Sequence, residues 1–234
     1  MAYTKRPDGR KFEEMREMES KIGVIKNADG SAMFRFGDTI AIAAVYGPKH
    51  LHPQHMQNPS KGIIRCYYDM LSFSVTERKK PGPNRRSQEI SKVTEWALAS
   101  VLDLESFPNT VVDVYIQVLQ ADASTRCAGI NAAAMALAHA GVPMKEMVSA
   151  VSMGKIDERL VVDLIKEEED YEDGEGATDI PVAFHSRSGK ICLLQLDGKI
   201  QPGQLKEAIN MGREACKQIH ELQKKTLKSI KENN

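Results

Sequence analysis

The order of apolar and polar positions along the chain predicts a mixture of strands and helices. Short apolar runs rich in β-branched residues, which are typical of strands, lie at 19–48, 62–75, 107–120, 148–164 and 178–200. Turn-forming residues at 28–30 and 36–38 divide the first run into three strands. The last two runs are interpreted as hairpins, which turn near 155–159 and 188–190.

Helical spacing replaces this pattern at three places. Apolar residues that recur every three or four positions predict a helix over 85–104. These residues are Ile90, Val93, Ala97, Val101 and Leu104. Ser87 is the predicted N-cap of this helix, because a hydroxyl can accept a hydrogen bond from the first turn. An alanine-rich segment predicts a second helix, which Gly141 and Pro143 end. The segment from Gln201 onward predicts a long amphipathic C-terminal helix.

The order of these elements favours an α+β fold, a mixed β-sheet with packed helices, over a doubly wound one. Strands outnumber helices, and several neighbouring strands form hairpins. The chain has no repeat of fixed short period and no linker rich in Gly, Ser or Pro. We therefore predict a single domain over residues 1–234 that ends with the C-terminal helix.

Composition places the chain among globular proteins without a uniform nucleic-acid-binding charge. Apolar residues make up 41% and charged residues 27%, and 32 Lys and Arg balance 32 Asp and Glu. The charge is uneven, because 76–86 is basic whereas 166–179 is acidic, and we expect a mobile acidic loop over 167–176. The four cysteines form no CxxC pair. With neither a signal peptide nor an apolar run of membrane-spanning length, the sequence predicts a cytoplasmic protein.

Two helix starts carry the residue types that bind phosphate. Ser124, Thr125 and Arg126 stand where the second helix begins, and Arg85 and Arg86 stand where the first begins. A helix N-terminus offers unpaired N–H groups and partial positive charge, to which hydroxyls and arginine add donors. An ordinary N-cap and a solvated basic loop are the alternatives at each place. The repetition favours an anion site.

Carboxylates of the acidic segment are the second candidate group. Asp179 directly precedes the apolar strand that begins at Ile180, and Asp173 lies in the same acidic run. Two such carboxylates can hold a divalent cation near a phosphate or act as a general acid. A solvated acidic loop is the alternative.

Four motifs together resemble the RNase PH family of phosphorolytic 3′–5′ exoribonucleases. They are "RPDGRKFEEMR", "RRSQEISK", "QADASTRCAGINAAAMALAHAGVPM" and "EDGEGATDIPVA", in that order along the chain. The resemblance extends from about Arg6 to the C-terminal helix and is strongest to catalytic subunits of archaeal exosomes. It implies the RNase PH fold, which is related to the second domain of ribosomal protein S5.

The same resemblance implies an activity and its partners. Such enzymes degrade single-stranded RNA from the 3′ end with inorganic phosphate as co-substrate, release nucleoside diphosphates, and can run in reverse to add tails. It implies that Arg86, Ser124, Thr125 and Arg126 bind phosphate and that Arg85 and Arg65 contact RNA. The implied partners are a related non-catalytic subunit in a hexameric ring, built as a trimer of heterodimers, and RNA-binding cap subunits.

For the carboxylates, the family pattern Glu-Asp-x-x-Gly-x-x-Asp matches Glu172, Asp173, Gly176 and Asp179. The resemblance thus implies that Asp173 and Asp179 are catalytic and hold Mg²⁺. Extra residues precede Asp173 in this chain, which leaves Asp170 as a rival for the first carboxylate. The family turn often has glycine where this chain has Ala123 or Ser124.

Two other functions within the family remain open from the sequence. One is a stand-alone RNase PH that trims the 3′ ends of transfer RNA, and the other is a catalytically inactive ring scaffold. The joint presence of Arg86, Arg126 and Asp179 favours the enzyme over the scaffold.

Overall fold

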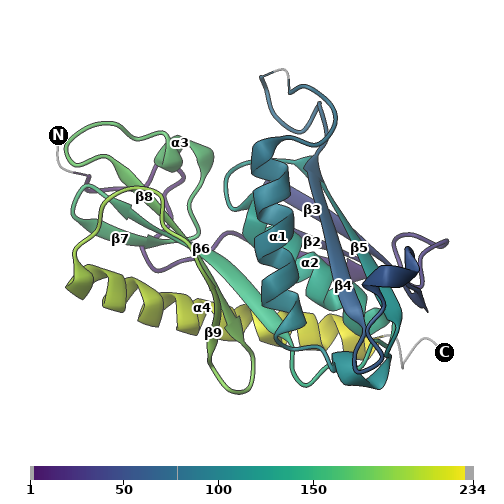
Figure 1. The fold of residues 1–234 in the computed structure, drawn as a ribbon. Helices are drawn as coiled ribbons and strands as arrows, with labels where there is room; N and C mark the ends of the chain where they lie inside the picture. The colour runs from purple at the N-terminus through teal and green to yellow at the C-terminus, as the bar shows by residue number, and fades with distance from the viewer. Residues whose placement is uncertain (1–2, 78, 230–234) are drawn as a thin grey trace.

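The computed structural model describes residues 3–77 and 79–229. Its elements are, in chain order, β1 (Met18–Ile22), β2 (Gly30–Phe36), β3 (Thr39–His50), β4 (Ile63–Met70), α1 (Arg85–Ala99), β5 (Thr110–Gln120), α2 (Thr125–His139), β6 (Val148–Ile156), β7 (Arg159–Val162), α3 (Lys166–Glu169), β8 (Ala177–His185), β9 (Ile191–Leu194) and α4 (Pro202–Lys228), with short 3₁₀ turns at Gln54–Met56 and Leu104–Ser106. Figure 1 shows their arrangement.

The strands form two sheets. One has the order β1-β2-β3-β5-β4 and is antiparallel except for the parallel pair β4 and β5. The other has the order β7-β6-β8-β9 and is antiparallel throughout. The mixed first sheet and the segregated helices confirm the predicted α+β class.

Three helices join the sheets into one packed body. The alanine-rich α2 packs against β2, β3 and β6, while α1 covers β4 and the long α4 runs along β6 and β1 (Figure 1). Asn131 of α2 ties the sheets together, because its side chain donates to the Ala150 carbonyl and accepts from the Ala150 N–H, each at 2.8 Å. One hydrophobic cluster therefore spans both sheets. The strands of the two sheets do not pair with one another. That the chain forms a single domain therefore stays a prediction.

The first helix begins differently from its prediction. Asn84, not Ser87, is the N-cap: its side chain accepts from the Ser87 N–H at 2.8 Å, and the Ser87 hydroxyl accepts from the Asn84 N–H at 2.9 Å. Asn84 has extended backbone angles, as an N-cap must, whereas Ser87 already lies in the first helical turn. The helix also ends at Ala99, before the predicted Leu104. Arg85 and Arg86 are thus the first two helical residues.

The acidic segment begins as a helix, where the sequence predicted a loop, and its mobility stays a prediction. Residues Lys166–Glu169 form the short helix α3, and the Glu168 side chain is fully buried. It accepts hydrogen bonds from Arg6 at 2.7 and 2.8 Å and from the Tyr3 hydroxyl at 2.7 Å. The N-terminal arm therefore fixes where the acidic segment begins.

Throughout 3–77 and 79–229, the helices are too short or too polar to cross a membrane.

Candidate active site

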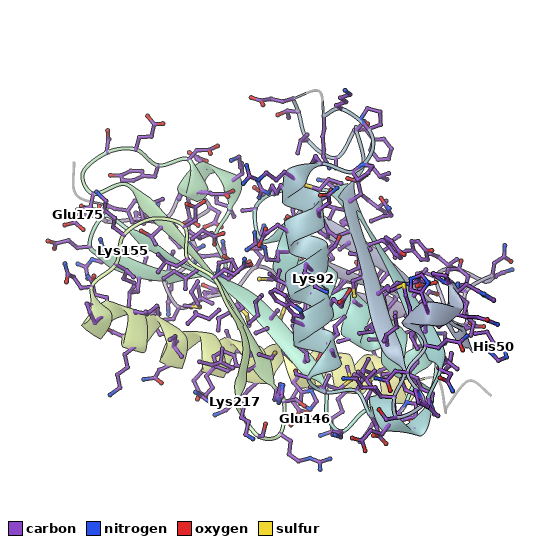
Figure 2. All side chains as sticks on the ribbon, viewed as in Figure 1. His50, Lys92, Glu146, Lys155, Glu175 and Lys217 are labelled. Atoms are coloured by element: carbon purple, nitrogen blue, oxygen red, sulfur yellow. The ribbon has the colours of Figure 1, made fainter. Side chains whose placement is uncertain are left out.

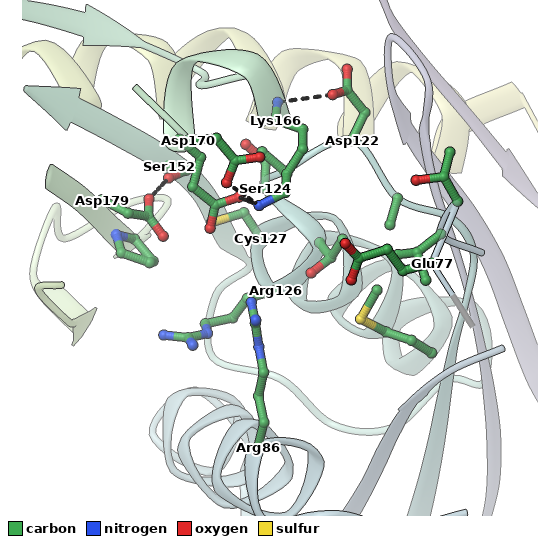
Figure 3. A pocket seen from close by; sticks show the side chains of 18 residues that line it. Glu77, Arg86, Asp122, Ser124, Arg126, Cys127, Ser152, Lys166, Asp170 and Asp179 are labelled. Carbon is green, nitrogen blue, oxygen red and sulfur yellow. Dashed lines mark hydrogen bonds and ion pairs between the residues drawn. The ribbon is translucent and has the colours of Figure 1, made fainter. Parts of the chain in front are cut away.

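A hollow of about 570 Å³ opens where the N-termini of α1 and α2 meet α3 and β8 (Figure 3). Its lining brings together six of the residues singled out from the sequence: Arg86, Ser124, Thr125, Arg126, Asp170 and Asp179. It does not include Asp173, Arg85 or Arg65. Two helix starts far apart in the sequence thus converge on one cavity, as an anion site requires.

The turn that precedes α2 has an unusual backbone. Ala123 and Ser124 have φ angles of 52° and 53°, in the left-handed region that favours glycine. Because such residues cost free energy, the surrounding structure must hold them. The Thr39 hydroxyl contacts the Asp122 and Ala123 carbonyls, each at 2.8 Å. Glycine would adopt this conformation at either position without strain.

Ser124 does not act as an ordinary cap of its own helix. Its side chain forms no capping bond to α2 and instead donates to Asp163 at 3.1 Å and to the Leu164 carbonyl at 3.2 Å. The hydroxyl therefore fixes the turn, and the part of the turn that can bind an anion is its backbone. The first N–H groups of any α-helix have no partner within the helix and carry partial positive charge.

Arg86 and Arg126 supply full positive charges at the cavity. Figure 3 shows the two side chains approaching one another from α1 and α2. Arg126 donates to the Gln195 side chain, and its Nη2 lies 3.7 Å from a Glu89 carboxylate oxygen. Its Nε is buried and has no hydrogen-bond partner among the residues that the structure describes. An anion between the two guanidinium groups would satisfy that donor and offset their repulsion.

Thr125 is held by a buried tyrosine that the sequence did not point to. The Tyr68 hydroxyl donates to Thr125 Oγ1 at 3.0 Å. Burial raises the pKa of Tyr68 to about 12, so this hydroxyl stays protonated near neutral pH. Thr125, as the acceptor of that bond, can donate its own hydrogen to a bound anion.

Asp179 faces the arginines from β8. Its carboxylate accepts a hydrogen bond from the Ser152 hydroxyl (Figure 3). Burial raises the pKa of Asp179 above its ordinary value; the Ser152 hydrogen bond and Arg126 act in the opposite direction, and Glu169 adds to the rise. A carboxyl with a raised pKa is better suited to donate a proton near neutral pH.

The structure does not bring Asp173 to the cavity that Asp179 lines, so the pairing of these two carboxylates stays a prediction. Both Asp170 and Asp173 are exposed, but Asp170, which pairs with Lys166 at 2.6 Å, lines the cavity together with Glu169, whereas Asp173 lies outside the lining. The helix α3 ends at Glu169 beside the cavity, and the chain after Asp173 lies against Asp157, at the turn between β6 and β7, whose N–H donates to the Gly176 carbonyl at 3.0 Å. Figure 2 shows Glu175 beside its ion-pair partner Lys155, near the end of β6.

The two predicted RNA contacts lie on different surfaces. Arg85 is exposed at the start of α1, next to Arg86. Arg65 lies on β4, where its Nε donates to Asp113 at 2.8 Å. Their roles in RNA binding stay predictions.

Sequence reasoning missed the residues that support the turn from beneath. Asp163 is fully buried and accepts from Arg16 through the side-chain Nε at 2.8 Å, Nη2 at 2.6 Å and the backbone N–H at 3.0 Å. The same carboxylate receives the Ser124 hydroxyl. Arg16 closes the first quoted motif, which was the only signal in the sequence. No local pattern links it to a residue 147 positions away.

Comparison with known proteins defines the class to which this fold and site belong. The family model described as "3' exoribonuclease family, domain 1" matches residues 14–143, and its domain 2 matches residues 146–215. The chain therefore belongs to the RNase PH family of 3′ exoribonucleases, and it has that family's fold. The two matches correspond to the two sheets, with α1 and α2 in the first.

Individual relatives are similar along nearly the whole chain. Exosome complex component Rrp41 of Methanopyrus kandleri is 47% identical over 95% of this chain and 92% of its own. Rrp41 of Thermococcus kodakarensis is 50% identical over 96% of this chain and 88% of its own.

Solved structures have the same fold. The crystal structure of rice Rrp46 matches with a TM-score of 0.83 and 26% identity, over 95% of this chain and all of that one. The Archaeoglobus fulgidus exosome with RNA bound to the active site matches with a TM-score of 0.79 and 22% identity, over 93% of this chain and 92% of that one.

Proposed function

We propose that this chain is the catalytic RNase PH-type subunit of an exosome ring, which degrades RNA from its 3′ end with inorganic phosphate. The observation that carries the proposal is the cavity itself. It joins Arg86, Arg126 and the N-terminus of α2, which suit a phosphate, to Asp179, which suits a proton transfer. Similarity to Rrp41 exosome components over nearly the whole chain supports the exosome assignment.

Phosphorolysis must bring two anions together. The phosphate that attacks and the phosphodiester that is cleaved repel one another, and nearby positive groups offset this repulsion. Arg86, Arg126 and the N–H groups of α2 would bind the phosphate and hold one oxygen in line with the terminal phosphorus. As the new P–O bond forms, the P–O3′ bond breaks and a nucleoside diphosphate leaves. Positioning and charge stabilisation supply most of the rate.

Asp179 would serve the leaving group. The departing 3′ oxygen needs a proton, and a carboxyl whose pKa is raised by burial can supply it. The reverse reaction uses the same groups, with Asp179 accepting the proton, and it would extend RNA from nucleoside diphosphates.

The cavity also suits a magnesium ion. Within residues 3–77 and 79–229, His, Cys, Asp and Glu form no cluster of three or more that could bind a metal. Mg²⁺, however, takes one or two carboxylates together with substrate phosphates and water. Asp179 and Asp170 both line the cavity, and they, rather than the Asp173 and Asp179 of the sequence-based prediction, would hold it. Because a carboxylate that binds Mg²⁺ is ionised, this role of Asp179 is the alternative to its role as proton donor. The ion would offset charge on the phosphates.

Degradation is expected to require inorganic phosphate, because the cavity gathers positive charge for a second anion beside the RNA. The measurement is product analysis by chromatography after the complex is incubated with a single-stranded RNA, with and without phosphate. Nucleoside diphosphates are expected only with phosphate. Nucleoside monophosphates released in phosphate-free buffer would instead identify a hydrolase.

The partners of the proposed function are a related non-catalytic subunit in a hexameric ring, RNA-binding cap subunits, and RNA in the cytoplasm. We expect the chain to be weakly active alone and to gain processive activity when it is mixed with the related subunit. Native mass spectrometry and RNA degradation measured on the same samples test this. A ring of identical chains with full activity would identify a stand-alone RNase PH instead.

The rival first carboxylates are distinguished by a matched pair of variants. Asp170→Asn is expected to lower kcat by about tenfold or more, because Asp170 lines the cavity. Asp173→Asn is the control and is expected to stay within twofold of wild type, because that side chain is exposed outside the cavity. Steady-state phosphorolysis of a short RNA measures both. If Asp173→Asn lowers kcat and Asp170→Asn does not, Asp173 is the first catalytic carboxylate, as the sequence motif implied.

A further inference from the structure

Three tyrosines form a cluster on the first sheet, on the side opposite α1 and α2. Tyr67 of β4 and Tyr115 of β5 are direct partners in the strand register, and their rings stack with centroids 4.9 Å apart at 12°. Tyr46 of β3 meets Tyr115 edge-on, with centroids 5.9 Å apart. Tyr67 and Tyr115 are 43% and 39% exposed. The cluster therefore presents aromatic surface to solvent on an open sheet face.

Positive charge lies beside this tyrosine cluster. Arg65, two residues before Tyr67 on the same strand face, and Lys49 at the end of β3 both pair with Asp113, at 2.8 and 2.7 Å. Asp113 is buried, whereas half of the Lys49 side chain is exposed. Two cations share one carboxylate, so a net positive charge remains next to the rings. The rings can stack on a base, and the positive charge can attract the phosphate of the same nucleotide.

Strand β4 connects the tyrosine cluster to the catalytic cavity. Met70, the last residue of β4, lines that cavity, and Tyr67 lies three residues earlier, roughly 10 Å away along an extended strand. A second hollow, of about 400 Å³, lies between β4 and α1 and includes Tyr67 in its lining. Tyr67 and Asp69 line one side of it, and Gln88 and Lys92 of α1 line the other. Lys92 projects from the visible side of α1 in Figure 2.

The start of α1 separates the two hollows. Arg86 lines the catalytic cavity, while Ser87 and Gln88 line the second hollow. A strand of RNA that has its 3′ end in the cavity can thus pass over the first turn of α1, along the second hollow, to the tyrosines.

We propose that Tyr67, Tyr115 and Tyr46 are a stacking platform for bases of single-stranded RNA upstream of the nucleotide in the cavity. This proposal rests on the proposed function, because it takes RNA as the substrate of that cavity. Aromatic side chains on an open sheet face bind bases in other RNA-binding folds. Such stacking tolerates any base, which a nuclease that moves along RNA needs.

The test compares alanine and phenylalanine at the same positions in the assembled complex. Tyr67→Ala and Tyr115→Ala are expected to weaken binding of a long unstructured RNA by about 10- to 100-fold. The Phe variants keep the ring and are expected to bind within about threefold of wild type. Trp96→Ala, which removes an aromatic side chain of α1 that is 61% exposed, is the control and should bind as wild type. Fluorescence anisotropy without phosphate gives each Kd.

Two further measurements complete the test. The loss should be much smaller for an RNA that is too short to leave the cavity, and RNA containing 5-iodouridine should cross-link to the peptide that carries Tyr67. Equal losses for short and long RNA, or wild-type binding by the Ala variants, would overturn the proposal. Native mass spectrometry covers the remaining outcome: if Tyr67→Ala breaks up the ring, the face is a subunit contact and the proposal is wrong.

Failure of the proposed function gives a different result. Anisotropy without phosphate reports RNA binding and not the reaction. If the products are not nucleoside diphosphates but the Ala variants still lose affinity, the platform stands and the phosphorolytic assignment falls.

Discussion

Asp179→Asn is expected to lower kcat by about 10²- to 10⁴-fold, the usual effect of losing a general acid or base. RNA affinity should stay the same or rise, because asparagine is neutral at every pH and cannot repel the RNA backbone as the ionised fraction of Asp179 does. The variant should remain folded, since asparagine can still accept the hydrogen bond from Ser152. Single-turnover phosphorolysis measures the chemical step, and anisotropy measures the affinity.

The pH dependence of the same variant gives an independent check. The leaving oxygen is protonated only while Asp179 carries its proton, so kcat of the wild type should fall as the pH rises through the raised pKa of Asp179. The residual kcat of Asp179→Asn should not show this fall with rising pH. A variant that keeps wild-type turnover and pH profile would exclude Asp179 from the chemistry.

Asp163→Ala is expected to cost about 3–5 kcal/mol in the free energy of unfolding, because it leaves Arg16 buried without its main partner. Asp163 is fully buried and accepts three hydrogen bonds from Arg16. The change also removes one of the two acceptors of the Ser124 hydroxyl and leaves only the Leu164 carbonyl, so the KM for phosphate should rise in whatever protein still folds. Urea unfolding followed by circular dichroism measures the stability.

Asp8→Ala is the matched control for this prediction. Asp8 also pairs with an arginine, Arg10, at 2.5 Å, but it lies at the surface. Exposed pairs contribute about 0–1 kcal/mol. If Asp8→Ala and Asp163→Ala lower the free energy of unfolding equally, burial of the Arg16 and Asp163 pair does not add to its stabilising effect.

The sign of the pH effect on stability follows from Asp163. Burial acts to raise the pKa of this carboxyl, but the hydrogen bonds and charge of Arg16 outweigh burial and hold the pKa below its ordinary value. A lowered pKa stabilises the folded protein above the pKa of the unfolded chain, and the effect is lost as the pH falls through the lower folded value. Acid should therefore narrow the difference between wild type and Asp163→Ala.

Local sequence patterns predicted the elements because neighbours a few residues apart determine them. The apolar spacing from Ile90 onward identifies α1, and the alanine-rich run identifies α2. The turn residues at 155–159 identify the hairpin of β6 and β7. Residue preference alone did not identify the N-cap of α1. The cap is Asn84 and not Ser87 because the two residues form reciprocal hydrogen bonds.

The sequence by itself determined that two arginine-bearing helix starts and an acidic segment exist, and it indicated a phosphate site there through the family motifs. Only the tertiary structure decided which carboxylate joins them. Asp170 and not Asp173 lines the cavity, and the segment that carries it is held by Arg6, which bonds Glu168 from 162 residues earlier in the chain. The tyrosine cluster likewise exists only because β4 and β5 pair in one register. Contacts between residues so far apart depend on packing of the whole chain, which no local pattern encodes.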